Sequence, residues 1–236
     1  MSAEDARGEL AKQIAGEIVV SDDPGGTIRK WRDDFDVTQT DLAEEIGVSS
    51  SVISDYEGGR RASPGIDFIR RLVEGLLVLD EHRGGDRIRQ YARVLSAGFD
   101  SEVVLDLREY EAAVSVEHFY SAIGAEEVLA GTWDRITGHT VINSVRAIMT
   151  LTHEEFFRLY GQSTSRALIF TEISRGESPL VALRVVTPTP NVVVLHGIER
   201  EELWDHASML ARMDGYALAT CSTPIDEVLD GLRRLP

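Results

Sequence analysis

Residues 38–61 read TQTDLAEEIGVSSSVISDYEGGRR, and this stretch decides the fold of the N-terminal part of the chain. Thr38 is suited to cap a helix, with Asp41 in the first turn, where an acidic side chain is favoured. The apolar face of this helix comprises Leu42, Ala43 and Ile46. Gly47 can take the positive φ that ends a helix and turns the chain within a few residues. The stretch therefore begins with a short helix that stops at a tight corner.

A second helix follows this corner. Ser49 is its expected N-cap, and its inward face is expected to comprise Val52, Ile53 and Tyr56. The outer face carries short polar side chains, namely Ser50, Ser51, Ser54 and Asp55. Such a face can enter the major groove of DNA and reach base edges. Gly58-Gly59 ends the helix, and Arg60-Arg61 follow where a phosphate backbone would pass.

The combined pattern resembles the phage-repressor and Cro family of helix-turn-helix domains, also called the XRE family. The residues that carry the resemblance are Gln39, Leu42, Ala43, Gly47, Val48, Ser49, Ile53, Ser54, Glu57, Gly59 and Arg61. The resemblance covers about residues 26–80, with Thr27–Phe35 as the preceding helix and Ser63-Pro64 opening the following one. The whole chain further resembles predicted archaeal regulators, haloarchaeal in type, that join this domain to a C-terminal α/β domain.

The resemblance implies a set of DNA-contacting residues. Gln39 would contact a phosphate from the start of the first helix. Ser50, Ser51 and Asp55 would face base edges, while Ser49, Ser54 and Arg60 would lie near the backbone with Arg61. Asp55 departs from the family pattern, because an aspartate can accept a hydrogen bond from cytosine but repels phosphates. Serine hydroxyls both donate and accept, so sequence preference is expected to depend partly on DNA shape or half-site spacing. The alternative is a helix pair used only for packing or protein contact.

The charge of the chain is unusual for a DNA-binding protein. Its 236 residues include 40 acidic and 24 basic side chains, a formal net charge of −16, and only Lys12 and Lys30 are lysines. This balance is typical of salt-in extreme halophiles, whose carboxylates keep the surface hydrated, and the alternative is an ordinary acidic protein from a GC-rich genome. In molar salt the Debye length is about 3 Å. The acidic total therefore does not exclude binding to nucleic acid.

Several other classes of protein are disfavoured. No run of about 18 apolar residues is present, so no membrane span is predicted. The start of the chain lacks the features of a secretion signal, and we expect a cytoplasmic protein. Cys221 is the single cysteine, which excludes an intrachain disulfide and a cysteine-built zinc site. The histidines lack metal-site spacing and no nucleotide-binding or nucleophile motif is present, so we expect no metal, no cofactor and no catalysis.

The helical pattern of the N-terminal part is interrupted at Gly84-Gly85. Residues 1–84 are expected to form the helix-turn-helix domain, opened by a helix over 5–18. Residues 86–236 are expected to form a second domain, whose first helix begins at an N-cap, Asp86. The predicted fold class is α+β overall: an all-α Cro-type helix-turn-helix domain followed by an α/β domain with a mixed sheet.

The second domain alternates between strand and helix patterns. The expected strands are 103–110, 136–142, 167–173, 180–186, 192–196 and 216–221. The expected helices are 143–149, 152–160, 199–213 and 224–235. The segment 167–186 is expected to be a strand pair joined by a turn. The segment 192–221 has the length and order of a βαβ unit, so its two strands are expected to be parallel neighbours.

Two loops of this domain follow those parallel strands. His196-Gly197 follows the first strand, and Ser222-Thr223 follows the second. Ligands of α/β sheets bind beyond the carboxyl ends of strands, so these four residues are candidate ligand-binding residues. The alternative is two tight turns, with Thr223 capping the last helix. Two further features each have two interpretations. Cys221 can be a redox sensor or a buried apolar residue, and Arg166, Arg175 and Arg184 can form an anion site or be ion-paired arginines.

These observations favour a sequence-specific transcriptional regulator that binds double-stranded DNA as a homodimer. A single helix-turn-helix makes few contacts, and two copies one helical turn apart add affinity and specificity. The second domain, helped by residues 86–97, is expected to dimerise. A further hypothesis makes it the sensor of a small-molecule effector that shifts operator affinity. An antitoxin-type autoregulator and an enzyme-fused autoregulator remain as alternatives.

Overall fold

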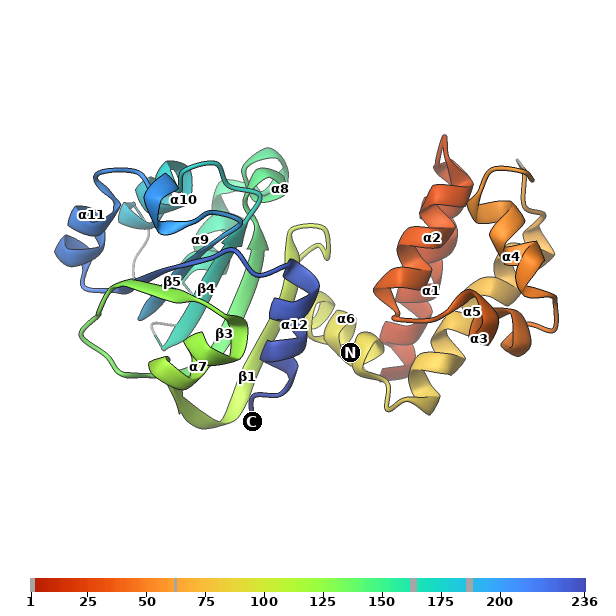
Figure 1. Cartoon of the computed structure of the whole chain (residues 1–236), viewed down its shortest axis with the longest axis horizontal. Helices are drawn as coiled ribbons and strands as arrows, with labels where there is room; N and C mark the ends of the chain where they lie inside the picture. Colours follow the sequence, from red (N-terminus) through yellow and green to blue (C-terminus); the bar gives the residue numbers. More distant parts are fainter. Residues whose placement is uncertain (1–2, 62, 162–164, 186–188) are drawn as a thin grey trace. The chain divides into compact units, whose positions relative to one another are not determined.

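The computed structural model describes residues 3–61, 63–161, 165–185 and 189–236, which form two compact units (Figure 1). The units are Met1–Ser96 and Ala97–Pro236. The division falls after helix α6 (Asp86–Ser96), whereas the glycine pair placed it at 84–86. Helix α6 belongs to the first unit because it packs against α1 (Ala3–Val20) and α5 (Ile66–His82).

The first unit consists of helices around one apolar core. Between α1 and α5 lie α2 (Pro24–Asp34), α3 (Gln39–Glu45) and α4 (Ser50–Glu57). The core is lined by large side chains from every one of these helices, among them Leu10, Ile14, Ile18, Trp31, Leu42, Ile53 and Leu76. The four-residue apolar spacing of the first helix thus produces the buried stripe that it predicts.

Helix α6 is capped from another helix. It begins at Asp86, and the buried carboxylate of Asp80 accepts hydrogen bonds from the backbone N–H groups of Arg87 at 3.2 Å and Ile88 at 3.0 Å. Asp86 itself is the first helical residue, so the prediction that it is the N-cap is wrong. Asp80 replaces it because α5 brings a carboxylate to the orphan N–H groups at the start of α6.

The second unit is built on a mixed sheet, as predicted. Among the described residues the strands are β1 (Val104–Ser115), β2 (Glu126–Leu129), β3 (Arg135–Asn143), β4 (Arg166–Thr171), β5 (Val192–His196) and β6 (Ala217–Cys221). They form one sheet in the order β1-β3-β4-β5-β6-β2. The four central strands are parallel, and the edge strands β1 and β2 are antiparallel to their neighbours. The expected parallel pairing within 192–221 is confirmed.

Helices cover both faces of this sheet (Figure 1). One face is covered by α7 (Val116–Ile123) and α12 (Ile225–Arg233), whose apolar side chains share a core with alternate residues of the strands. The other face is covered by α8 (Ser144–Thr150), α9 (His153–Gly161), α10 (Glu177–Arg184) and α11 (Ala207–Asp214). Right-handed connections between successive parallel strands place these four helices on one side.

The segment 180–186 corrects one prediction, because its residues up to Arg184 lie in α10 rather than in a strand. Gly176, in a left-handed conformation, starts the helix, and its buried residues are Pro179, Leu180 and Leu183. That spacing follows a helical face, and a proline is tolerated in the first turn. Val186 lies outside the described residues.

Two further differences concern neighbouring segments. The expected helix over 199–213 is divided into a 3₁₀ turn, η1 (Arg200–Glu202), and α11. Helix α7 and edge strand β2 were not predicted. Finally, within the described residues no helix has both the length and the apolar composition that crossing a bilayer requires.

Candidate nucleic-acid interface

The corner between α3 and α4 forms as its sequence predicts. The hydroxyl of Thr38 accepts a hydrogen bond from the backbone N–H of Asp41 at 3.1 Å and so caps α3. Gly47 has a φ of 67°, and the backbone N–H of Val48 donates to the carbonyl of Ala43 at 2.9 Å. The side chain of Arg71, on α5, donates to the carbonyl at the end of α3, Ile46. The first helix is thus closed at both ends before the chain turns into α4.

Two glycines allow the helices around this corner to approach closely. A Cβ atom on Gly25, in α2, would lie 2.2 Å from the carbonyl oxygen of Tyr56 in α4. A Cβ atom on Gly75, in α5, would lie 2.5 Å from Cγ2 of Ile46 and 3.3 Å from Cδ1 of Leu42. Real Cβ atoms do not approach other atoms so closely. These glycines therefore set the spacing of α4 against α2 and of α3 against α5.

A buried carboxylate joins α2, α3 and α4. The side chain of Glu57, at the end of α4, is 0% exposed. Arg32 donates to it from Nε at 2.7 Å and from Nη2 at 3.0 Å, and its Nη1 donates to the carbonyl of Val37 at 2.8 Å. The amide of Gln39 donates to Glu57 at 2.8 Å, and Arg29 lies 3.5 Å away. This cluster holds the two helices of the corner in a fixed relation.

The cluster also determines the charge of Glu57. Burial alone raises the pKa of this carboxyl group, but hydrogen bonds from Arg32 and Gln39 outweigh burial and leave the pKa below its ordinary value of 4.5. The ionised carboxylate is therefore the form that the folded domain holds. The same contact raises the pKa of Arg32, chiefly through its hydrogen bonds to Glu57.

The outer face of α4 carries the serines that the sequence places there. Ser49, Ser50 and Ser51 are exposed, and Ser54 is partly buried. Ser49 occupies the N-cap position of α4 but makes no capping hydrogen bond. Its hydroxyl lies 2.8 Å from that of Ser51, so the predicted side-chain cap is wrong. The backbone N–H groups at the start of α4 therefore remain available to an acceptor other than the Ser49 side chain.

Asp55 is paired with the two arginines that follow α4. Nε of Arg60 donates to its carboxylate at 2.6 Å, and Nε of Arg61 lies 3.7 Å from the other carboxylate oxygen. Arg60 also donates to the hydroxyl of Ser54 at 3.2 Å, and Arg61 lies over the ring of Tyr56. Both guanidinium groups remain half or more exposed, whereas the Asp55 side chain is about a third exposed. The negative charge on this face is therefore offset by two neighbouring positive charges.

Comparisons with known proteins bear on this geometry. A model of the helix-turn-helix domain matches residues 25–84. A helix-turn-helix (HTH)-type transcriptional regulator of Methanocaldococcus jannaschii is 38% identical to this chain over 228 residues, which is 96% of this chain and 95% of the relative. Another, from Archaeoglobus fulgidus, is 42% identical over 226 residues, which is 95% of this chain and 96% of the relative. The chain belongs to the HTH-type transcriptional regulators.

The regulator is thus a DNA-binding protein, and its helix-turn-helix is the part that binds DNA. A weaker similarity, 25% identity over 158 residues, links it to a phosphoribosyl imidazole-carboxamide isomerase of Methanothermobacter thermautotrophicus. That match covers 66% of the regulator and 60% of the isomerase, whereas both relatives matched over nearly their full length are named regulators. No solved structure matches the regulator.

The candidate ligand residues of the second unit lie together at the carboxyl ends of β5 and β6. Nε2 of His196 is 2.8 Å from the backbone carbonyl oxygen of Thr223, and the N–H of Gly197 donates to the carbonyl of Cys221. Ser222 is exposed beside them. His196 and Thr223 thus contact each other, and a ligand role for the four residues stays a prediction.

The other features of the second unit have structural roles. Cys221 is buried, which raises the pKa of its thiol, and its Sγ lies 3.2 Å from the carbonyl oxygen of Ile123. The three arginines proposed as an anion site each form an ion pair: Arg166 with Glu109, Arg175 with Glu177 and Arg184 with Asp214. Among the described residues, no group of three or more histidine, cysteine or acidic side chains is arranged to hold a metal ion.

Sequence reasoning missed the roles of two residues of the buried cluster, Glu57 and Arg32. Glu57 is part of the motif, but the motif predicts no role for it, and Arg32 was not predicted to have one. One signal was present: Glu57 follows Ile53 by four residues, which puts it on the inward face of α4. A charged residue on an inward face requires a partner of opposite charge, and α2 supplies it.

Proposed function

We propose that the regulator binds DNA in the manner of the Cro family, with α4 in the major groove. The observation that supports this most is the composition of its outer face. Ser50 and Ser51 are exposed at the start of α4, where recognition helices contact base edges. Asp55 lies one turn further on, with its charge offset by Arg60 and Arg61. An aspartate so paired can approach DNA with less repulsion from phosphates than an isolated one.

The remaining residues would contact the DNA backbone. Arg60 and Arg61 are exposed beyond the end of α4, where each can exchange its contact with Asp55 for one with a phosphate. Gln39 begins α3, and its amide group carries two N–H donors, of which one is used by Glu57. Glu57 would thus orient Gln39 so that the second donor can bind a phosphate. Ser49 and Ser54 would flank the same strand.

We further propose that the regulator acts as a homodimer through its second unit. Residues 86–97 are less suited to this role than the sequence indicated, because the apolar side chain of Ile88 in α6 is buried in the core of the first unit. Helices α10 and α11 offer a better surface. They adjoin each other, and each is associated with two exposed large apolar residues one turn apart: Val181 with Val185, just after the end of α10, and Met209 with Met213 in α11. Such exposed apolar patches commonly mark interfaces.

We also propose that the regulator binds DNA at high salt concentration. The net charge of −16 would oppose approach to DNA in dilute buffer, whereas molar salt screens it over about 3 Å. The acidic, lysine-poor composition therefore favours a haloarchaeal type of regulator whose DNA contacts are short-range hydrogen bonds and ion pairs. Any effector would act by binding the DNA-competent and DNA-incompetent forms unequally.

The direct test replaces Arg60 and Arg61 by alanine, singly and together. Affinity for all DNA sequences is expected to fall, and each change should lower the slope of log affinity against log salt concentration by about 1. Lys12→Ala is the matched control, because it removes an exposed positive charge from the first unit, one that pairs with Glu9 of the same helix, α1. Fluorescence anisotropy over a range of KCl concentrations measures both quantities. Arginine variants that bind as tightly as Lys12→Ala would overturn the assignment.

A second variant separates two possible roles of Arg60. If Arg60 only neutralises Asp55, then Asp55→Asn should restore the affinity that Arg60→Ala loses. We expect little restoration, because Arg60 is proposed to contact a phosphate directly. Ser50→Ala, Ser51→Ala and Asp55→Asn should instead change which sequences are preferred, by about 1–3 kcal/mol at the bases concerned. Selection from a random DNA library measures this preference, and an unchanged preference in all three would place base reading elsewhere.

A further inference from the structure

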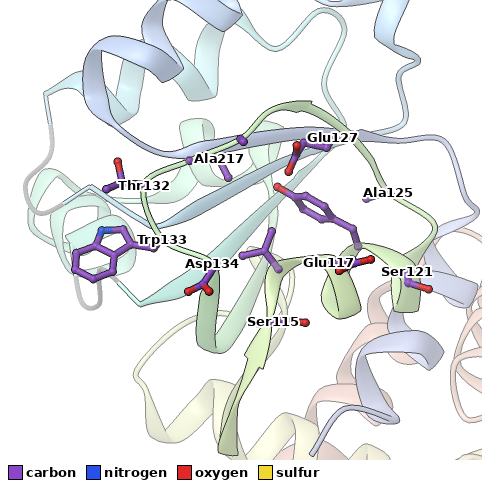
Figure 2. Close-up of a pocket in the computed structure, with 13 residues that line it drawn as sticks. Ser115, Glu117, Ser121, Ala125, Glu127, Thr132, Trp133, Asp134 and Ala217 are labelled. Carbon is purple, nitrogen blue, oxygen red and sulfur yellow. The ribbon is translucent and has the colours of Figure 1, made fainter.

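The second unit contains a cavity at the edge of the sheet opposite to the predicted ligand loops. Its volume is about 640 Å³, which lies within the range of small-molecule sites. It is lined by the end of β1, helix α7, strand β2, the connection over 130–134 and the first residue of β6, Ala217 (Figure 2). These are the amino ends of the parallel strands, so this cavity is distinct from the loops at His196 and Ser222.

The charged residues that line this cavity are all acidic. Glu117 from α7, Glu127 from β2 and Asp134 before β3 line it, and none of the lining residues is lysine, arginine or histidine. Figure 2 shows these three carboxylates arranged around the cavity. None of the three forms an ion pair within the described part of the chain, whereas Glu126, their neighbour outside the cavity, pairs with Arg200. The lining therefore carries a negative charge of up to three, and the cation beside it, Arg200, donates to the backbone carbonyl of Glu127 at 3.1 Å rather than to its carboxylate.

Tyr120 provides an independent sign that a ligand binds here. It lines the cavity, its residue surface is only 6% exposed, and its hydroxyl oxygen has no hydrogen-bond partner among the residues that the structure describes. Nearly all buried polar groups in folded proteins have a hydrogen-bond partner, so each exception requires an explanation. Burial, and to a lesser extent the nearby charge of Glu127, raises the pKa of Tyr120 far above its ordinary value of 10.0. The group is thus a neutral phenol, able to accept a hydrogen bond from a cationic N–H and to donate one.

The rest of the lining suits an organic part of a ligand. Ala125, Ala130 and Val116 supply apolar surface, and the hydroxyls of Ser115, Ser121 and Thr132 supply further acceptors. Trp133 is exposed at the rim, where an indole ring can bind a cation through its π face. An inorganic anion would be repelled, and a neutral apolar molecule would leave the carboxylates and the phenol unpaired.

We propose that this cavity binds a small organic cation, an amine with its ammonium group between Glu127 and the hydroxyl of Tyr120. Aromatic and carboxylate groups together are suited to ammonium recognition, because the π face and the carboxylate both attract a positive charge. The site goes beyond the DNA-binding function and does not depend on it.

The test uses the full-length regulator without DNA, at a KCl concentration that keeps it folded and is the same in all arms. Isothermal titration calorimetry compares putrescine with 1,4-butanediol, and phenethylamine with 2-phenylethanol, so that each amine has a neutral counterpart of similar shape. At least one amine is expected to bind saturably with one site per chain, and its neutral counterpart is expected not to bind. Absence of saturable binding by both amines, or equal binding of an alcohol, would overturn the proposal.

Variants then locate the site. Glu127→Gln should weaken binding of that amine about tenfold or more, because a charge-assisted hydrogen bond is lost, and Tyr120→Phe should weaken it severalfold. Glu154→Gln is the matched control, since Glu154 is an exposed glutamate on α9 outside the cavity. An equal loss in Glu154→Gln, or no loss in Glu127→Gln, would show that the amine binds elsewhere. Because no DNA is present, these outcomes are independent of the tests on Arg60 and Arg61.

Discussion

At the scale of single residues, Glu57 matters most for the helix-turn-helix. Its side chain is fully buried and accepts hydrogen bonds from Arg32 and Gln39, so it connects α4 with the two preceding helices. The guanidinium of Arg32 is only 12% exposed. A buried ion pair need not stabilise a protein relative to an apolar pair, but removing one partner leaves the other charge buried alone.

Glu57→Gln is therefore expected to destabilise the first unit by about 3–5 kcal/mol. Glu44→Gln is the matched control, because Glu44 is an exposed glutamate of α3 and should change stability by at most about 0.5 kcal/mol. Urea unfolding followed by fluorescence measures the first unit when Trp133 and Trp204 are replaced by phenylalanine, which leaves Trp31 as the only tryptophan. Equal stability of the two glutamine variants would contradict the assigned role.

The lowered pKa of Glu57 adds a pH dependence with a definite sign. A carboxyl group whose folded pKa lies below its unfolded pKa stabilises the fold fully above the unfolded value, and this contribution is lost as the pH falls through the folded value. The ordinary value is 4.5. The difference in unfolding free energy between the parent and Glu57→Gln should stay constant at neutral pH and shrink below that value. The same urea series repeated at acidic pH measures it, and a difference that grows on acidification would exclude the ionised form as the stabilising one.

At the scale of elements, the corner depends on how closely α4 lies against α2. The space at Gly25 is closed by the backbone oxygen of Tyr56, which cannot move away as a flexible side chain can. A larger residue must therefore displace one helix relative to the other. By contrast, at Gly16 in α1 no described atom beyond the neighbouring backbone of the same helix lies within 4 Å of the position that a Cβ would take.

Opposite effects are thus expected from the same chemical change at these two positions. Gly25→Ala should destabilise the first unit by about 1–3 kcal/mol, as overpacking does, and should weaken DNA binding because α4 is displaced. Gly16→Ala should stabilise it by about 0.5–1 kcal/mol, since alanine is favoured over glycine within a helix. Fluorescence of Trp31 during urea unfolding and DNA anisotropy measure the two effects. A Gly25→Ala protein as stable as Gly16→Ala would show that the α2–α4 contact is not tight.

At the scale of the whole molecule, the proposed dimer joins two copies of the helix-turn-helix to one operator. An interface between identical chains is self-complementary, so one patch on each chain is sufficient. The proposed interface comprises the exposed side chains of Val181, Val185, Met209 and Met213, and the ion pair of Arg184 with Asp214 at 2.9 Å joins α10 to α11. Helix α8 carries a second exposed apolar group, which includes Met149.

Met213→Glu is accordingly expected to convert a dimer into a monomer, because it places a charge in an apolar interface. Met149→Glu makes the same change on α8 and is expected to leave the dimer intact. Light scattering after gel filtration in molar KCl measures the mass of each. DNA affinity should fall in Met213→Glu alone, while both variants keep the unfolding profile of the parent. A monomeric parent, or a monomer from Met149→Glu instead, would contradict this interface.

The sequence by itself determined the helix-turn-helix and most strands of the second unit. Thr38 and Gly47 act on neighbouring residues, so their effects can be predicted without the rest of the chain. The parallel pairing of β5 and β6 was also predictable, because a short connection with a helix limits how two strands can lie. The polar outer face of α4 follows from helical periodicity alone.

Only the tertiary structure decided which groups meet across the fold. Glu57 finds Arg32 through the packing of α4 on α2, and α10 forms a helix because one of its faces is buried by tertiary packing. The acidic cavity exists because β2 pairs with β6, which brings α7 and the connection over 130–134 beside Ala217. Contacts between segments far apart in the sequence depend on packing and pairing, which leave no local pattern that a short window of sequence can reveal.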